Sequence, residues 1–340
     1  MRWLIVKVIN LLIVLVAVTF IVAALTSGPM AQIQIDQYKQ GLQQAVKNIP
    51  GLTPKERQEW VQEKLQDYIT SQGLNKPWYY LAVKYTWQLL KFEDLNATTM
   101  TTQYWHQGSR KVLYIIGERI PFSIMLFTTS SVLTLIFALP LALYAARRPG
   151  GKVDNTIVTW SVFSVSMPWW WLAMVFIYLF AYKWHIFAGP GAQTNWKDPV
   201  DVLNRMALPV LTVTLLSIGD SAFRMRNILL DTFNEDFVTV ARAKGVPERM
   251  VLMKHVLRAA APPIVTIVLF SLVLSVVNGA IITELVFNWF GMGRLYWDAI
   301  EKNDVPVLVE LTYITTLLYL LTRFALDILY TYLDPRIRRA

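Results

Sequence analysis

The stretch from Glu235 to Ile264, "EDFVTVARAKGVPERMVLMKHVLRAAAPPI", decides the fold because it is charged and yet lies between two long apolar segments. Its first part fits a helix that Gly245 can end, and Val246 precedes Pro247, which disfavours continuing the helix. A second helix fits from Pro247 onward, until two prolines open the next apolar segment. The stretch therefore predicts a helix, a sharp turn and a second helix outside the apolar part of the protein.

The rest of the chain has the composition of a membrane protein. Of its 340 residues, 55% are hydrophobic and only 16% are charged, which lies outside the usual range for soluble globular domains. Windows of about 18 or more residues with few charges predict six transmembrane helices. These are Val8–Leu25, Phe122–Ala146, Ile157–Tyr182, Ala207–Phe223, Ile264–Leu285 and Val307–Tyr330. The predicted fold class is an all-α polytopic membrane protein.

The positions of lysine and arginine in the short loops predict the orientation, because these residues are retained on the cytoplasmic side. With six spans, four basic groups fall on one side: Arg2 and Lys7; Arg147, Arg148 and Lys152; the segment Arg224–Arg258; and Arg336, Arg338 and Arg339. Both termini and the quoted stretch are therefore predicted to be cytoplasmic, in a multi-pass protein of the cell membrane. The formal net charge of +9 then reflects topology rather than binding to nucleic acid.

The chain divides into three predicted parts: a first transmembrane anchor at 1–26, an extracytoplasmic helical domain at 27–118, and a core of five transmembrane helices at 119–340, which includes a cytoplasmic loop at 231–260. The first span is read as an uncleaved anchor, since its apolar core exceeds the 7–15 residues of a signal peptide.

Two helices are predicted in the extracytoplasmic domain. The first has Thr53 as N-cap, Pro54 at the first helical position, Glu56 to complete a capping box and Gly73 to end it. The second, Pro77–Leu90, is strongly aromatic. It fits packing beneath the first helix, and it also fits lying along the membrane surface.

Motifs of catalysis are missing from the sequence. It has no G-x-x-x-x-G-K-[ST] for nucleotide phosphates, no H-E-x-x-H and no G-x-S-x-G. Three scattered histidines, His106, His185 and His255, do not suggest a metal site, and the chain has no cysteine. We therefore expect this chain to have no ATPase site, no catalytic residue, no bound cofactor and no metal.

Charged residues near or within the spans are candidates for function because each is costly in lipid. Asp220 and Arg224 lie four residues apart, so they can neutralise each other on one helix face. Glu284 and Glu310 have no obvious partner in the sequence. All four are candidates to line a translocation path or a gate.

Residue chemistry alone leaves two interpretations of the quoted stretch open: a docking surface for a partner protein, or a basic amphipathic hairpin on anionic lipid. The stretch resembles the signature loop of ABC-transporter membrane subunits of the oligopeptide/dipeptide/nickel importer family, whose form is close to D-Y-V-R-T-A-R-A-K-G followed by H-x-L-R. The matching residues are Asp236, Val238, Ala241, Arg242, Ala243, Lys244, Gly245, His255, Leu257 and Arg258. Phe237, Thr239 and Val240 depart from the commonest residues.

Other segments extend the resemblance over nearly the whole chain. They are "GLNKPWYYLAVKYTWQLL", "ERIPFSIMLF", "FGMGRLYWDAIEKNDVP" and "YLDPRIR". Phe290 stands where the family commonly has proline, and "EDLNA" replaces a Gly-Asp-containing run. The long outer segment after the first span is most similar to the B-type member of a B/C pair.

The resemblance implies a type I ABC importer fold and a set of partners. These are a homologous second permease subunit, two cytoplasmic ATPase subunits that use ATP and Mg, an external substrate-binding protein and membrane lipid. The ATPase-coupling residues would be Glu235, Asp236, Ala241, Arg242, Ala243, Lys244 and Gly245. The aromatic helix would dock the binding protein or brace the outer gate. Short peptides are the expected substrate, with oligosaccharides or a nickel chelate as alternatives. A function of another class is a stand-alone receptor or channel whose basic loop binds lipid.

Overall fold

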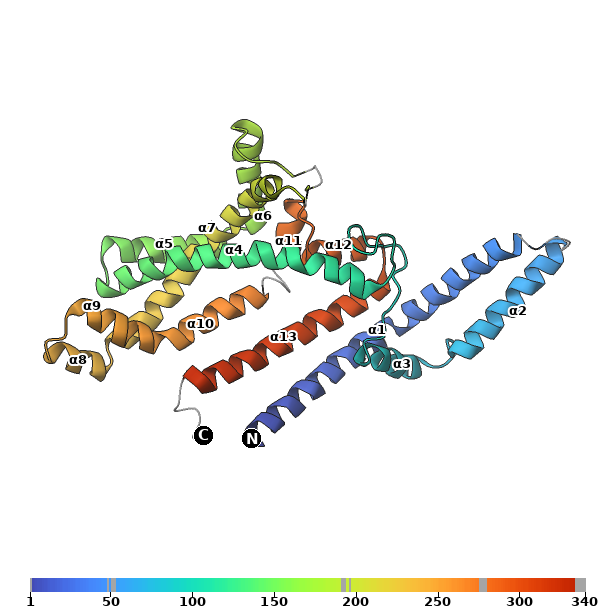
Figure 1. The fold of residues 1–340 in the computed structure, drawn as a ribbon, viewed down its shortest axis with the longest axis horizontal. Coiled ribbons are helices and arrows are strands. Elements are labelled where there is room, and N and C mark those ends of the chain that lie inside the picture. Colours follow the sequence, from blue (N-terminus) through green and yellow to red (C-terminus); the bar gives the residue numbers. More distant parts are fainter. Residues whose placement is uncertain are drawn as a thin grey trace. The chain divides into compact units, whose positions relative to one another are not determined.

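The computed structural model describes residues 2–47, 49, 53–190, 194–195, 197–274 and 280–333, and within these ranges the chain is nearly all helical (Figure 1). Five helices are long and apolar enough to cross a membrane, and a bent pair of helices supplies a sixth crossing if it is counted as one span. The predicted fold class, an all-α polytopic membrane protein, is confirmed.

The long helices are α1 (Arg2–Lys47), α4 (Val112–Arg147), α7 (Pro199–Phe233), α10 (Leu257–Leu274) and α13 (Val305–Leu333). The shorter ones are α2 (Pro54–Gln72), α3 (Trp78–Leu90), α5 (Lys152–Ser166), α6 (Trp169–Phe176), α8 (Asp236–Ala243), α9 (Glu248–Met250), α11 (Ala280–Val286) and α12 (Met292–Glu301). Two π-helical segments, η1 (Ile177–Lys183) and η2 (Val251–Val256), extend α6 and α9.

The first, third and fifth predicted spans differ from the structure. The first helix does not end at Leu25 but runs on to Lys47. The span expected at Ile157–Tyr182 is two helical segments, Lys152–Ser166 and Trp169–Lys183, that meet at 97°. Met167 is extended there because it precedes Pro168, which disfavours helical backbone at that position.

The fifth predicted span, Ile264–Leu285, corresponds to α10 and α11, and residues 275–279 between them lie outside the described part of the chain. The basic tail residues Arg336, Arg338 and Arg339, which supported the predicted orientation, also lie outside it.

The chain forms two compact units, one of Met1–Glu118 with Tyr296–Phe324 and the other of Arg119–Leu295 with Ala325–Ala340. In the first unit α1 packs against both α2 and α3. The predicted capping box of α2 is confirmed: the Glu56 backbone N–H donates to the Thr53 hydroxyl at 3.3 Å, and the Thr53 N–H donates to the Glu56 carboxylate at 2.7 Å. Gly73 ends the helix with a φ of 66°, as expected for a left-handed C-cap.

In the second unit α5 crosses α7 at close range. Trp160 lies against Gly219, where a Cβ atom would come within 2.0 Å of the indole ring. The Trp160 indole N–H donates to the backbone carbonyl of Leu215 at 3.2 Å. Only glycine lets the indole approach the α7 backbone this closely, so this contact fixes how α5 lies on α7.

Candidate functional site: the charged hairpin

The charged hairpin (residues 235–258) consists of α8, a tight turn, α9 and η2. Gly245 ends α8 with a φ of 73°, in the left-handed region that favours glycine. The Gly245 N–H donates to the backbone carbonyl of Arg242 at 2.9 Å, and the Val246 N–H donates to the backbone carbonyl of Ala241 at 3.2 Å. Pro247 then precedes α9. The predicted helix, turn and second helix are confirmed, with Gly245 and Pro247 in the expected places.

The hairpin is held to the second unit by apolar side chains. Val238 and Ala241 are buried on the inner side of α8 and join a cluster that includes Val251 and Val256 of η2 and Leu229 of α7. These contacts fix α8 at the end of α7 by packing, without a buried charge on α8.

The outer side of α8 exposes two apolar residues. Phe237 is 41% exposed and Val240 is 51% exposed. Ala241, which follows Val240 directly in the sequence, is turned inward together with Val238. An exposed apolar pair on a short, rigid helix is the kind of surface that a partner protein can cover.

An ion pair crosses the turn of the hairpin. The Arg242 guanidinium donates to the Glu248 carboxylate through Nη2 at 2.9 Å and through Nε at 3.2 Å. The hydrogen bonds that Arg242 donates to the Glu248 carboxylate raise the pKa of Arg242 above its ordinary value. Both side chains are partly exposed, so the pair braces the turn geometrically more than it stabilises the fold.

The remaining predicted coupling residues face solvent. Glu235 occupies the N-cap position of α8 and Asp236 its first turn, where negative charge is favoured by the helix dipole. Ala243 and Lys244 are exposed at its C-terminal end. The seven predicted residues are thus together on one element, six of them exposed and Ala241 buried.

A buried ion pair near the hairpin was missed by the sequence analysis. Asp154, in the first turn of α5, accepts hydrogen bonds from Arg226 of α7 at 2.6 and 2.7 Å, and also from the backbone N–H of Gly150 at 2.8 Å. The carboxylate side chain is 3% exposed. A lone acid directly after a basic loop was the available signal, but its partner lies 72 residues away in the sequence.

Asp220 and Arg224 form the predicted pair within α7. The Arg224 Nε donates to both Asp220 carboxylate oxygens at 2.9 Å, and both side chains are partly exposed. The internal pairing expected from their spacing is therefore confirmed.

Glu284 is fully buried, and its carboxylate is surrounded by donors. It accepts from the Ser123 hydroxyl at 2.6 Å and from the Arg294 backbone N–H at 3.1 Å. Ser123 in turn accepts from the N–H of Met292 at 2.8 Å. A Cβ atom at position 291 would lie 2.1 Å from the Glu284 carboxylate. The chain can pass this close to Glu284 only because residue 291 is glycine.

Glu310 belongs to a different set of carboxylates, which bind the segment of residues 92–111 in the first unit. It accepts from the backbone N–H of Leu95 at 3.0 Å. Asp304, fully buried, accepts three backbone N–H groups and one hydroxyl, from Thr98, Thr99 and Met100, at 2.8–3.1 Å. We call residues 92–111 the carboxylate-bound loop.

Two more acids complete the binding of this loop. Glu118 accepts the backbone N–H groups of Gln103, Tyr104 and Trp105. Asp94 accepts from Val112 at 2.7 Å, and burial raises the pKa of its carboxyl in spite of that hydrogen bond. The donors are backbone groups, which carry no sequence signature, so the pattern of residues could not reveal these partners.

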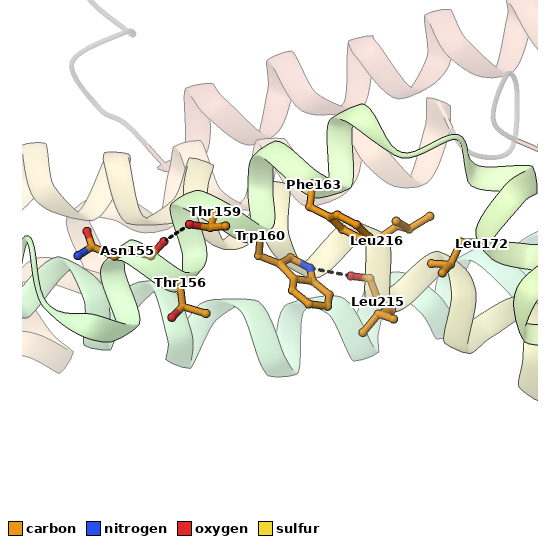
Figure 2. Close-up of a pocket in the computed structure, with 8 residues that line it drawn as sticks. All are labelled: Asn155, Thr156, Thr159, Trp160, Phe163, Leu172, Leu215 and Leu216. Carbon is orange, nitrogen blue, oxygen red and sulfur yellow. Dashed lines mark hydrogen bonds between the residues drawn. The ribbon is translucent and has the colours of Figure 1, made fainter.

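A pocket of about 590 Å³ opens along α5, α6 and α7 (Figure 2). It is lined by Asn155, Thr156, Thr159, Trp160, Phe163, Leu172, Leu215 and Leu216. None of these lining residues is charged. The pocket therefore offers an apolar wall with a few polar groups near Asn155, and no group that would pair with the charged ends of a peptide.

Comparison with known proteins places this architecture in a class. Residues 138–339 match the family described as binding-protein-dependent transport system inner membrane component. The chain is 30% identical over 275 residues to the oligopeptide transport system permease protein AppB of Bacillus subtilis (strain 168), covering 80% of this chain and 84% of that protein. It is 34% identical over 230 residues to a protein of Brucella suis biovar 1 (strain 1330) named as a peptide permease, covering 66% and 70%.

Among solved structures, an inward-facing form of the MetNI methionine ABC transporter matches with a TM-score of 0.51 and 19% identity, over 65% of this chain and 97% of that chain. The fold is therefore that of an ABC importer membrane subunit. The chain belongs to the family of binding-protein-dependent transport system inner membrane components.

Proposed function

We propose that this permease subunit imports short peptides and is coupled to ATP hydrolysis in partner subunits through the charged hairpin. The observation that carries the proposal is the outer side of α8, where Phe237 and Val240 are exposed on a helix whose inner side is fixed by packing. A helix held this way can transmit a push to α7 and α10 without bending. The substrate class is inferred from the relatives, which are named as oligopeptide and peptide permeases.

The complex that this mechanism requires contains four kinds of chain. A homologous second permease completes the path, two ATPase subunits bind ATP and Mg, and an external binding protein delivers the substrate. The present chain is the B-type permease, with both termini and the hairpin in the cytoplasm, and it has no ATPase site of its own. Closure of the ATPase dimer favours the outward-open state, which is a rigid-body switch biased by a ligand bound elsewhere.

The residues of the hairpin have distinct roles in this proposal. Gly245 lets the chain turn sharply, so that α8 projects as a compact knob. Arg242 and Glu248 brace the turn. Glu235, Asp236 and Lys244 surround the apolar contact with polar groups, and the small side chain of Ala243 leaves the backbone beside it accessible.

The test replaces one exposed apolar residue with a charge. Val240→Glu is expected to lower ATP-driven peptide uptake and copurification of the ATPase subunits at least several-fold, since a carboxylate would be buried in the contact. The matched control is Thr239→Glu, on another exposed side of the same helix, which is expected to leave both readouts near the unsubstituted level. Full uptake by the Val240→Glu variant would refute the coupling role of the hairpin.

Substitution at Gly245 is a less specific test of docking. Because its φ is 73°, any residue with a side chain strains the turn, even though a Cβ atom there would meet open space. A loss of uptake in Gly245→Glu would therefore report the shape of the turn as well as the contact.

The substrate is best assigned through the separate binding protein. Peptide affinity of that protein, measured calorimetrically against oligosaccharides and nickel chelates, distinguishes the three substrate classes. If the binding protein recognised a sugar or a chelate and not peptides, the substrate part of the proposal would be wrong while the coupling part stood.

The role of the four charged residues in a path or gate stays a prediction. Asp220 is paired with Arg224, and Glu284 and Glu310 already accept hydrogen bonds from protein donors. The most direct contribution of Glu284 and Glu310 to transport would be to hold the loops whose donors they bind.

A further inference from the structure

α3 is apolar on both of its sides, which is unusual for a helix that is only half covered. One side packs within the first unit and is buried: Leu81, Ala82, Tyr85, Thr86 and Leu89. α1 is its principal packing partner. The other side needs a separate explanation, because an exposed helix side in water normally carries polar residues.

The exposed side of α3 is formed by aromatic and aliphatic side chains. Tyr79, Val83 and Trp87 are 57%, 59% and 60% exposed, and Tyr80 beside them is 41% exposed. These positions are three or four residues apart, so they form one continuous stripe along the helix. A stripe of this composition is too apolar to be a water-facing surface, so something of matching chemistry covers it.

Lysines flank this stripe at both ends of the helix. The Lys76 ammonium lies 4.0 Å from the centre of the Tyr80 ring, and the Lys91 ammonium lies 5.2 Å from the centre of the Trp87 ring. Tryptophan, tyrosine and lysine together are typical of the boundary between hydrocarbon and lipid headgroups, where a ring and a charged tip are both satisfied. An anionic headgroup would complement the two ammonium groups.

The position of α3 along α1 agrees with that boundary. Figure 1 shows α3 beside the middle of α1, and α1 is the most apolar membrane-crossing helix of the described chain. The exposed large apolar residues of α1 lie between Ile5 and Leu25, in the first half of that helix. Because α3 packs on α1, its exposed stripe lies beside a helix that has lipid-type residues in its first half.

We propose that α3 is an interfacial anchor helix, whose exposed stripe lies in the headgroup region of the bilayer leaflet from which α1 emerges, covered by phospholipid. This requires only that α1 spans the membrane, and it holds whatever the transporter carries. It also gives α3 a different role from docking the binding protein or bracing the outer gate, which the family resemblance had implied, and it develops the membrane-surface position that the sequence had left open. The anchor would fix the α1–α2 hairpin above the membrane surface.

The absence of cysteine from the chain allows a clean test. A single cysteine is introduced as Val83→Cys and labelled with an environment-sensitive fluorophore, and the full-length chain is placed in nanodiscs of phosphatidylethanolamine and phosphatidylglycerol. The control is Gln62→Cys, at an exposed position of α2. The label at position 83 is expected to emit at shorter wavelength. It should be quenched several-fold more by lipids carrying a nitroxide near the headgroup, with the control label quenched by iodide from water instead.

Two results would overturn the proposal. A label at position 83 that is open to iodide until the binding protein is added would make the stripe a protein-docking surface. A label shielded from both iodide and nitroxide lipid would mean that another protein segment covers it. If Val83→Cys failed to insert, Tyr79→Cys on the same stripe is the substitute, with the same expected result.

Discussion

The charged hairpin and the carboxylate-bound loop are both short connecting segments, but they are held in opposite ways. The hairpin is fixed by buried apolar residues, Val238 and Ala241, and its ion pair is exposed. The loop is fixed by buried acids, chiefly Asp304 and Glu118, that accept backbone N–H groups. The first design leaves an outer surface free for a partner. The second uses its polar groups internally, so it is suited to hold a shape.

The largest loss of stability is expected from removing the Asp304 carboxylate. Asp304→Ala would leave three backbone N–H groups without their acceptor, that of Met100 buried and those of Thr98 and Thr99 part-buried. A buried polar group without a partner costs about 1–3 kcal/mol. We expect the variant to be destabilised by about 3–5 kcal/mol. This would appear as a large drop in the unfolding midpoint in detergent and rapid proteolysis within residues 98–104.

The matched control for that prediction is Glu301→Ala, an exposed acid at the end of α12. It is expected to change stability by no more than about 0.5 kcal/mol. Equal effects of the two substitutions would show that Asp304 does not hold the loop.

Gly291 tests whether a buried acid elsewhere fixes its loop in the same manner. Gly291→Ala would place a Cβ atom 2.1 Å from the Glu284 carboxylate, so the carboxylate or the loop must move. We expect a destabilisation of about 1–3 kcal/mol from this overpacking, measured as a lowered unfolding midpoint.

Gly41→Ala supplies the comparison for Gly291, because a Cβ atom at Gly41 in α1 meets open space. Alanine favours helix over glycine by about 1 kcal/mol, so this variant is expected to be neutral or more stable. A neutral Gly291→Ala variant would argue against a close fit between the loop and Glu284.

Substitutions at Gly245 test how much the charged hairpin depends on the left-handed backbone of its turn. At Gly245, with φ of 73°, Gly245→Val should destabilise the turn by about 1–2 kcal/mol, whereas Gly245→Asn should be tolerated better because asparagine adopts left-handed backbone more readily. Uptake and ATPase copurification are expected to follow the same order. Equal loss in both variants would mean that the side chain itself, and not the backbone, is harmful.

These two regions also show what the sequence could predict. Gly245, Pro247 and the capping box at Thr53 are local signals, since their effects are exerted within a few residues, and the structure confirms them. Apolar windows likewise predicted the all-α class. The 97° bend at Pro168 could not be separated from an ordinary span by composition, because both of its arms are apolar.

The sequence could not predict which distant residues donate hydrogen bonds to the buried acids. Glu284 and Glu310 had no obvious partner in the sequence, because the side-chain donor to Glu284 lies 161 residues away and the donor to Glu310 lies 215 residues away. For Glu310 that donor is a backbone group, which any residue type can supply. The partner of Asp154 is a side chain, but it is also distant, since Arg226 follows 72 residues later on another helix. Residue patterns predict which segments are helices, while the pairing of buried charges depends on the packed fold.

The smallest expected effect concerns the ion pair of the hairpin. Glu248→Ala removes the bonds to Arg242, but both groups are partly exposed, so the loss of stability should be below about 1 kcal/mol and smaller still at high salt. ATPase coupling should be affected more than stability, because the unpaired Arg242 loses the bidentate contact that sets its position beside α8. Stability is measured by thermal unfolding, and coupling by the ratio of peptide taken up to ATP hydrolysed. A variant with lower stability and an unchanged ratio would show that the pair only holds the turn, and the exposed apolar residues would then carry the contact alone.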